Sequence, residues 1–271
     1  MSLLWPVTNI PLVVIPPVRT ELAATRTYYV LKTGNDANTG LANDAAHAFL
    51  TVQHAVDVAR TLDQFGYAVI IQVGDGTYAE QITVNPVQVG IGNFTIQGNA
   101  GIPGNVIINS VGDAVTVYGP SYLLIKDCRI QSTTSGIHAR RGALVDFQNV
   151  EFNTCTTYHI QSREYSRIRA SGNYGIIGDS GRHIQATNGG MFLVDSVLTI
   201  TLTGLRAFTI FAFAGNLSLT LVDSTQATIV GAATGQRYYA AYNAVIQTYG
   251  GGANFFPGNA AGATVNGGIY V

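Results

Sequence analysis

The chain has 271 residues, of which 11% are charged, and its formal net charge is −1 at pH 7. So weak a charge gives no electrostatic footprint for nucleic acid or an anionic membrane surface, and we expect neither partner. The 31 glycines and 14 tyrosines favour short strands joined by tight corners over a helical architecture.

The first 25 residues are predicted to form an extended arm. Four prolines in this segment are incompatible with a helix or an interior strand. Trp5, Ile10, Val14 and Ile15 make it too apolar for a solvated tail, so we expect it to dock. Its partner is either its own chain, a sister subunit or a larger assembly that the arm anchors. The arm lacks the basic region of a secretory signal, and its prolines and length exclude a transmembrane helix, so membrane insertion is not expected.

The next segment, residues 26–66, is predicted to cap an ordered domain. It contains a strand near Tyr28, a turn-rich loop at 34–40 and apolar residues at helical spacing between Thr51 and Leu62. Thr51 is in position to be the N-cap of that helix. The core at the first coil of a solenoid needs a cover, and this helix is the natural one.

Three motifs in and after this segment carry a resemblance. They are Thr33-Gly-Asn-Asp-Ala-Asn-Thr-Gly-Leu41, Phe49-Leu-Thr-Val-Gln-His-Ala-Val-Asp57 and Gly74-Asp-Gly-Thr-Tyr78. Together they resemble the N-terminal segment of pectate-lyase-like right-handed parallel β-helix proteins, a form common in phage and prophage tail proteins. The resemblance implies right-handed coils. Oxygens of Asn35, Asp36 and Asn38 could hold a cation, but stabilising Asx turns are the expected use.

A short pattern recurs between residues 136 and 211 and predicts a stack of β-coils. Its central apolar residues, Ile137, Ile160, Ile184 and Phe208, are separated by 23, 24 and 24 residues. Repeats of this length, with alternation inside each strand, are typical of a solenoid. We therefore expect a single-stranded all-β parallel β-helix over residues 67–232. It is followed by a segment, 233–271, rich in glycine and aromatic residues, which is available to cap the helix or to support oligomerisation. That segment resembles the C-terminal portion of proteins encoded in alphaproteobacterial prophages.

A second series has an apolar residue two positions before Asp, Asn or Ala. Its members are Ile125/Asp127, Phe147/Asn149, Ile168/Ala170, Leu193/Asp195 and Leu221/Asp223. Asp and Asn tolerate the left-handed backbone of a sharp corner, so we interpret these positions as structural corners, with the apolar residues pointing inward. The aspartates are accordingly poor catalytic candidates.

If the central apolar residues point inward, the residues that follow them point outward. This places His138, Gln161, Gln185 and Thr209 in one outward column, with Arg140 and Arg163 two positions further along. Such a sheet is either a platform that binds a bacterial surface polysaccharide or a plain solvated face. The glycan-binding candidates are His138, Arg140, Gln161, Arg163 and Gln185.

The C-terminal half contains strands that are apolar on both faces, and such strands must be buried on both. We expect an oligomer interface there, formed by Val194, Leu205, Ile210, Phe211, Phe213 and Val222. The resemblance to β-helix spikes implies a homotrimer.

A catalytic site is not evident. Glycoside hydrolysis needs two carboxyl groups at defined spacing, and the outward candidates are Glu151, Glu164 and Asp179. His159 and His183 are expected one coil apart as core or corner residues. Cys128 and Cys155 lack metal-ligand spacing, and no cofactor motif is present, so neither a metal nor a cofactor is expected.

Three hypotheses follow. The first is a phage or prophage virion protein, a spike or fibre made in the bacterial host cytoplasm, bound to other virion proteins through the arm and recognising an envelope glycan. The second is a polysaccharide depolymerase, a hydrolase or lyase of the same fold. The third is a head or tail decoration protein without a ligand.

Overall fold

The computed structural model describes residues 19–86 and 89–271. The anchor candidates Trp5, Ile10, Val14 and Ile15 lie outside the described residues.

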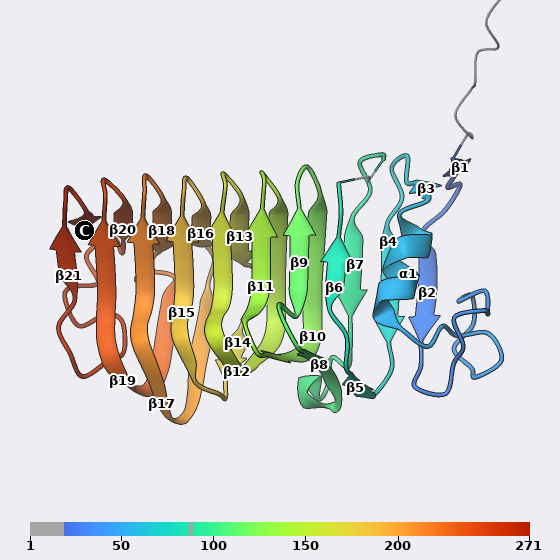
Figure 1. The fold of residues 1–271 in the computed structure, drawn as a ribbon, viewed down its shortest axis with the longest axis horizontal. Coiled ribbons are helices and arrows are strands. Elements are labelled where there is room, and N and C mark those ends of the chain that lie inside the picture. The colour runs from blue at the N-terminus through green and yellow to red at the C-terminus, as the bar shows by residue number, and fades with distance from the viewer. Residues whose placement is uncertain (1–18, 87–88) are drawn as a thin grey trace, which may run out of the picture.

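The described chain is a solenoid of parallel strands whose coils stack along one axis (Figure 1). Each complete coil contributes a strand to each of three faces. Face 1, toward the viewer in Figure 1, consists of β6 (Ile82–Val84), β9 (Val115–Tyr118), β11 (Ser135–Arg140), β15 (Ser180–Thr187), β21 (Ala263–Val265) and the last parts of β12 (Leu144–Arg163), β17 (Leu198–Gly215) and β19 (Ala227–Ala241).

The other two faces lie behind face 1. Face 2 consists of β2 (Arg26–Val30), β4 (Val69–Val73), β7 (Phe94–Gln97), β13 (Arg167–Ala170), β16 (Met191–Val194), β18 (Leu219–Val222), β20 (Val245–Gln247), β22 (Ile269–Tyr270) and the first parts of β10 (Tyr122–Ser132) and β12. Face 3 consists of β5 (Gly76–Tyr78), β8 (Val106–Ser110), β14 (Tyr174–Ile176), the end of β10, the middle of β12 and the starts of β17 and β19.

The coil is right-handed. The face 1 strands run upward in front, the chain returns behind them, and successive coils advance from right to left (Figure 1). Right-handed connection is the rule for parallel strands, because it suits the twist of the strand. The prediction of an all-β, right-handed parallel β-helix is thus confirmed.

The inward column predicted on face 1 is correct for three coils and wrong for the fourth. Ile137 pairs with Ile160 and Ile160 with Ile184, but Ile184 pairs with Ala212, whereas Phe208 pairs with Ser180. The error arises because β17 and β19 shift register on both sides of 205–207, where extra residues bulge from the coil. Constant spacing therefore fails where a coil lengthens.

The predicted series of corners also holds only in part. Asp127 and Asn149 have φ of 61° and 49°, and Asn149 Nδ2 donates to Asp127 Oδ1 over 2.8 Å, so these two are stacked left-handed corners. Ala170 instead pairs with Phe147 in the inward column, and Val194 and Val222, which pair with each other, follow in the same register. Asp195 and Asp223 directly follow β16 and β18, as corner residues should, but are not among the described residues with positive φ. Asp223 Oδ1 accepts from Thr225 N (2.8 Å), so its corner is an Asx turn without the left-handed conformation.

The regular turns of this solenoid lie between face 1 and face 2, at positions outside the predicted series of corners. Pairs of residues with positive φ recur there once per coil: Glu164/Tyr165, Asn188/Gly189, Asn216/Leu217, Tyr242/Asn243 and Asn266/Gly267. Buried serines next to these turns hydrogen-bond their backbone. Ser166 Oγ, for example, accepts from the backbone N–H groups of Gly142 and Ala143, each at a distance of 3.1 Å. Asn and Gly supply the left-handed conformation at low cost, which explains their frequency here.

A helix covers the first coil, as predicted. Helix α1 (Val52–Ala59) buries Val52, Ala55, Val56 and Ala59, and its N-cap Thr51 accepts from the N–H of His54. The helix ends before Leu62. Leu62 instead belongs to β3 (Leu62–Asp63), which pairs with β1 (Thr20–Glu21). A 3₁₀ turn, η1 (Pro103–Asn105), precedes β8.

The loop before α1 is held by carboxylate and amide oxygens that hydrogen-bond the protein itself. Asp36 accepts from Leu50 N (2.8 Å), Thr51 N (2.9 Å) and Thr51 Oγ1 (2.8 Å), and Asn35 Oδ1 forms an Asx turn with Ala37 N. The loop-stabilising use of these residues, expected from the sequence, accounts for their contacts.

Asp36→Ala should lower the free energy of unfolding by about 2 kcal/mol, because three donors around the helix start lose an ionised acceptor. Urea denaturation at pH 7 measures this change. The matched control is Asn35→Ala, which removes one exposed hydrogen bond and should cost no more than about 0.5 kcal/mol. Equal losses in both variants would contradict a capping role for Asp36.

At the other end of the solenoid, the aromatic segment closes the core. Strand β19 runs across residues 232 and 233, and β21 and β22 extend faces 1 and 2 by one more coil. Phe256 is fully buried, with its ring 5.7 Å from that of Phe211, and Tyr238 stacks on Tyr270 with ring centroids 3.7 Å apart. Aromatic side chains thus fill the position that a further coil would cover.

Two histidines lie inside the core. His159 and His183 are fully buried on consecutive coils; their Nδ1 atoms are 3.1 Å apart, and Tyr174 Oη is 3.0 Å from His183 Nε2. Burial lowers the pKa of His159 to about 3, opposed by backbone groups of Asn153 and Asp179, and also lowers the pKa of His183. The expected interior placement is confirmed, and both imidazoles are neutral at pH 7.

Candidate functional site

The structure brings the predicted glycan-binding residues together on face 1. His138, Gln161 and Gln185 form one column on successive coils, and Arg140 and Arg163 stand side by side two positions along. The column continues with Phe213 and Tyr239, so the placement of Thr209 in it was wrong. His138, Gln161 and Gln185 are only 6%, 8% and 5% exposed, so this part of face 1 offers less accessible polar surface than expected.

An aspartate that sequence reasoning missed holds His138 in place. His138 Nδ1 lies 2.7 Å from Asp113 Oδ2, and Asp113 Oδ1 accepts from Thr134 Oγ1 (2.6 Å) and Ser135 N (3.1 Å). Although burial raises it, these hydrogen bonds hold the pKa of Asp113 well below its usual value. The two residues are far apart in the sequence, and only the coil register reveals the pair.

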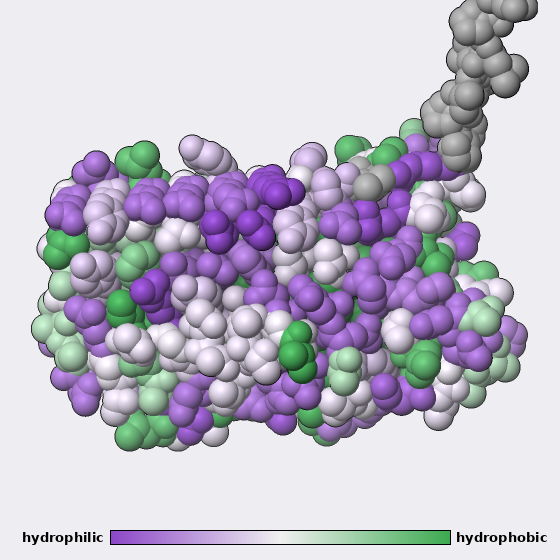
Figure 2. All heavy atoms as spheres, in the orientation of Figure 1, coloured by the Kyte–Doolittle hydropathy of each residue, from purple (hydrophilic) through white to green (hydrophobic). Residues whose placement is uncertain are grey.

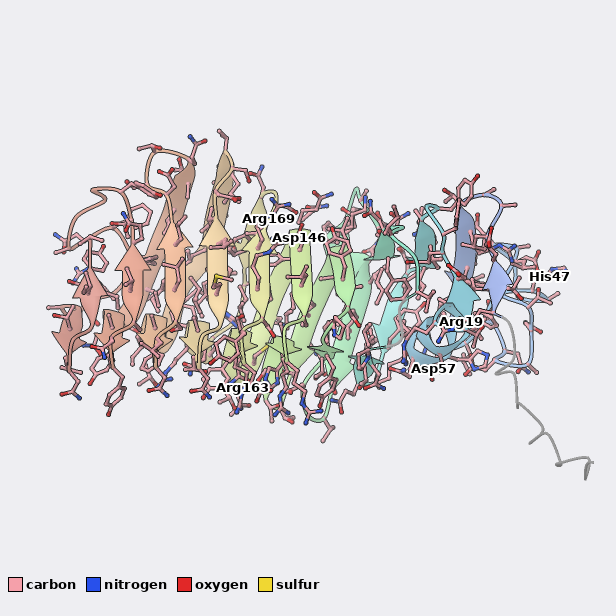
Figure 3. All side chains as sticks on the ribbon, turned by 90° about the horizontal axis from the view of Figure 1, so that it is seen from above. Arg19, His47, Asp57, Asp146, Arg163 and Arg169 are labelled. Carbon is pink, nitrogen blue, oxygen red and sulfur yellow. The ribbon has the colours of Figure 1, made fainter. Side chains whose placement is uncertain are left out.

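Charged side chains gather at the turn edge between faces 1 and 2, visible as the darkest patch along the upper edge in Figure 2. Glu164 contacts Arg163 (3.0 Å), Arg140 (3.1 Å) and Arg141 (4.0 Å). Across that edge, Asp146 contacts Arg169 at 2.8 Å; Arg163 and Arg169 lie on opposite sides of it (Figure 3). These arginines all have carboxylate partners, and Glu164 is ion-paired.

The three catalytic candidates do not converge. Glu151 lies on face 3 and pairs with Arg129 at 2.7 Å, Glu164 lies in a turn after face 1, and Asp179 lies in the bend between faces 3 and 1, 3.7 Å from Arg206. Each carboxylate is held by a different arginine in a different part of the coil. They therefore form no pair across a common substrate position, as glycoside hydrolysis would need.

A groove follows the bend between faces 3 and 1, where β12, β15 and β17 succeed one another. One part, of about 550 Å³, is lined by Thr154, Thr156, Asp179, Gly181 and Thr209, with Phe208 among its apolar residues. A second part, of about 220 Å³, shares Thr156, Gly181 and Thr209 and extends to Tyr158 and Arg182. The shared residues make the two parts one continuous, open groove across three coils.

Arg182 stands at one end of this groove on an aromatic support. Its guanidinium carbon is 4.1 Å from the ring centroid of Phe213 and 5.8 Å from that of Tyr158, and it donates through Nη1 to Gln185 Oε1. Phe213 in turn stacks on Tyr239, with centroids 5.7 Å apart and planes 5° apart. Burial lowers the pKa of Arg182, and the Tyr158 side chain opposes this effect. Sequence reasoning missed Arg182 because its column lies at the bend, where inward and outward positions do not alternate.

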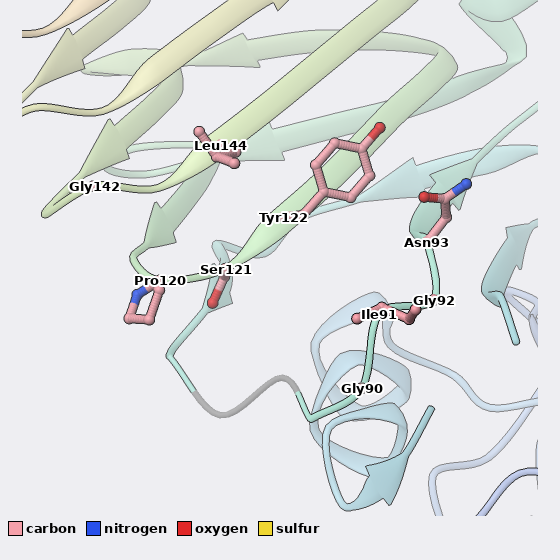
Figure 4. A pocket seen from close by; sticks show the side chains of 9 residues that line it. All are labelled: Gly90, Ile91, Gly92, Asn93, Pro120, Ser121, Tyr122, Gly142 and Leu144. Carbon is pink, nitrogen blue, oxygen red and sulfur yellow. The ribbon is translucent and has the colours of Figure 1, made fainter. Parts of the chain in front are cut away.

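A second concavity, of about 280 Å³, lies at the opposite edge (Figure 4). It is lined by glycines 90, 92 and 142, by Ile91, Pro120 and Leu144, and by the polar residues Asn93, Ser121 and Tyr122. None of the described residues that line it is charged, so they lack the combination of charge and aromatic surface found in the groove.

The predicted oligomer interface requires correction. Val194, Val222 and Phe211 are core residues, at most 1% exposed, and Ile210 is 8% exposed; only Leu205, at 63%, and the half-buried Phe213 lie outward. The inward placement of Ile125, Phe147 and Ile168 on face 2 was correct, but on β16 and β18 the prediction was one residue out of phase, and such a slip exchanges the two sides of a strand. The outward residues there are Leu193 and Leu221, with Met191, Leu219 and Val245 in the next column.

No group of three or more His, Cys, Asp or Glu side chains close enough to share a metal ion occurs in the described part of the chain. Cys128 and Cys155 are both buried and unpaired. Within residues 19–86 and 89–271, no helix has the length and apolar character needed to cross a membrane.

These features define the class of protein: an all-β parallel β-helix with a polar groove at one corner. No protein-family profile and no curated protein matches the sequence. Among solved structures, the chain is similar to pectin methylesterase from Aspergillus niger in deglycosylated form, at 13% identity and a TM-score of 0.40, over 92% of this chain and 94% of that one. A TM-score of this size carries no inference about activity, and the fold assignment follows from the strand pairing.

Proposed function

We propose that the chain is a phage or prophage virion protein, a spike or fibre that presents the groove to a bacterial envelope glycan and is attached to the particle through residues 1–25. The β-helix fold, the three motifs after residue 33 and the apolar, proline-rich arm support this proposal.

The proposed glycan binding rests on the groove at the bend between faces 3 and 1. Sugars present hydroxyl groups at their rims and apolar faces on their rings, so they bind where polar side chains lie beside aromatic ones. Thr154, Thr156 and Thr209 supply hydroxyls, Asp179 supplies a carboxylate, and Tyr158 supplies an aromatic ring. The groove is open along its length, which suits a segment of a long polymer.

The proposal includes a homotrimer that associates through the outward side of face 2. Met191, Leu219 and Val245 form one apolar column there, and Leu193 and Leu221 form a second beside it. On β16, β18 and β20 these columns contain no charge and run parallel to the solenoid axis; one coil earlier they continue as Arg167 and Arg169, which are paired with Asp146. A second copy of this chain with a parallel axis presents a strip of the same length, and contact between the strips places no charges against one another.

Filling the groove should weaken glycan binding. Thr156→Trp or Thr209→Trp is expected to lower affinity at least about tenfold, because the indole occupies the volume shared by both parts of the groove. Binding is measured on an array of bacterial capsule and O-antigen glycans, followed by titration of those that bind. The control is Thr228→Trp at an exposed threonine of face 3. Absence of binding by the native chain to every glycan would overturn the proposal, and so would equal affinities of all variants.

The attachment part is tested on particles released by the bacterium that encodes the chain. Mass spectrometry should find the protein in purified particles, and deletion of residues 1–25 should remove it from them. A full-length protein absent from particles would contradict the virion assignment.

A further inference from the structure

Arg182 differs from the other arginines near the groove and the turn edge in having no carboxylate partner. Arg140, Arg163 and Arg206 lie within ion-pair distance of Glu164 or Asp179. Within the described residues, no Asp or Glu lies within 4.0 Å of Arg182. A half-buried cation without a counter-charge is costly to maintain for stability alone.

The side chain of Arg182 is also held in a fixed orientation. Phe213 packs on the guanidinium at 4.1 Å, and Gln185 accepts its Nη1 hydrogen bond. A guanidinium has five N–H donors in a planar fork, and one is used here. Because stacking and the glutamine fix the plane in advance, little side-chain entropy is lost when the remaining donors bind an anion.

We propose that the groove recognises an acidic glycan, and that Arg182 binds the anionic group of one sugar unit, a carboxylate or a phosphate, while the threonines and the Asp179–Arg206 pair contact neutral hydroxyls further along. This inference rests on the proposed glycan-binding function and adds the chemical class of the ligand. A fork that binds both oxygens of a carboxylate or phosphate explains an arginine at this position.

Charge balance along the groove agrees with this assignment. At the far end, Asp179 is 3.7 Å from Arg206, so its charge is compensated, whereas Arg182 leaves a net positive charge at its own end. A polymer with one anionic group per repeat would place that group at Arg182 and its neutral sugars over Thr156 and Thr209.

The experiment compares glycans before and after removal of their charge. The array contains uronate-bearing, sialic-acid-bearing, phosphate-bearing and neutral bacterial polysaccharides; each one that binds is then reduced at its carboxylates or stripped of phosphate and titrated again. Native protein, Arg182→Gln, Arg182→Lys and Arg141→Gln are measured side by side. Arg141 is 69% exposed in the turn edge and serves as the matched control for loss of one positive charge.

Binding glycans should all carry an anionic group, and either neutralising the glycan or Arg182→Gln should weaken binding at least about tenfold, with no further loss when both are combined. Arg182→Lys should lose part of the affinity, because it retains charge without the fork, and Arg141→Gln should lose none. If reduction of carboxylates weakens binding, the anionic group is a carboxylate; if removal of phosphate weakens it, the group is a phosphate. Binding of neutral glycans as tightly as acidic ones, by native protein, would overturn the inference and leave the proposed function standing. Should Arg182→Gln fail to fold, the glycan treatments on native protein decide the question alone.

Discussion

Val194→Asp is expected to prevent folding of the solenoid, whereas the same change at the adjacent Leu193 should leave it folded. Val194 is 0% exposed between Ala170 and Val222 in the core, where an unpaired carboxylate has no solvent and no partner. The expected loss in the free energy of unfolding is about 5 kcal/mol or more. Leu193 points outward on face 2, so its replacement should cost the subunit no more than about 1 kcal/mol. Circular dichroism and urea denaturation measure both.

The same pair of variants tests the proposed assembly. Native protein should have a mass in solution of about three times 28.7 kDa by light scattering, and Leu193→Asp should shift it to about 28.7 kDa, because three carboxylates would meet in an apolar contact. A folded Val194→Asp with an unfolded Leu193→Asp would show that the strand register is reversed. A folded native monomer would contradict the trimer but leave the register intact.

Acid should destabilise the protein over an unusually high pH range, from about pH 6.5 downward. In the unfolded chain His159 and His183 bind protons near pH 6.5, whereas burial lowers the pKa of His159 to about 3 and that of His183 well below its ordinary value. The unfolded state therefore binds more protons in this window, and the free energy of unfolding falls as the pH drops. The shift at His159 alone corresponds to a loss on the order of 4 kcal/mol by pH 3.

Urea denaturation at pH 7, 6, 5 and 4 measures this dependence. The double variant His159→Leu, His183→Leu should flatten the profile between pH 6.5 and 4, although it lowers stability at pH 7 by leaving Tyr174 without its partner. The control is His47→Gln, at a side chain that is 56% exposed and lies outside the core, and the steep fall between pH 6.5 and 4 should remain in it. Below about pH 4 a further loss is expected from Asp113, whose lowered pKa contributes stability only above that range. A profile of the double variant as steep as that of the native chain would exclude the two histidines as its cause.

The repeat length and the inward isoleucines were sufficient to predict the architecture. Ile137, Ile160 and Ile184 recur at nearly constant spacing because each occupies the same position in successive coils. The alternation of apolar and polar residues around them indicates that these repeats form β-strands. Thr51 and the apolar spacing after it were sufficient for the covering helix.

Register was less predictable, for two physical reasons. Coils that contain β17 and β19 include extra residues, so equal spacing misplaced Phe208. Where both residues of a pair such as Leu193 and Val194 are apolar, alternation does not indicate which one faces the core.

The candidate site was predicted only as a column. The stacking of His138, Gln161 and Gln185 was predicted correctly. Their burial was not, because it depends on side chains from other coils, such as Asp113, which the local sequence around each residue does not reveal. The groove was missed because it forms at the bend between two faces, from a lengthened coil. Arg182 belongs to that bend and is identified only when its distances to Phe213 and to the carboxylates are known.

The most direct test of the account is a crystal structure of the protein with the tightest-binding acidic oligosaccharide from the array. We expect the sugar chain in the groove, over Thr156 and Thr209, with its anionic group within hydrogen-bond distance of the Arg182 guanidinium. A sugar bound on another face, or in the groove with its anionic group pointing away from Arg182, would contradict it.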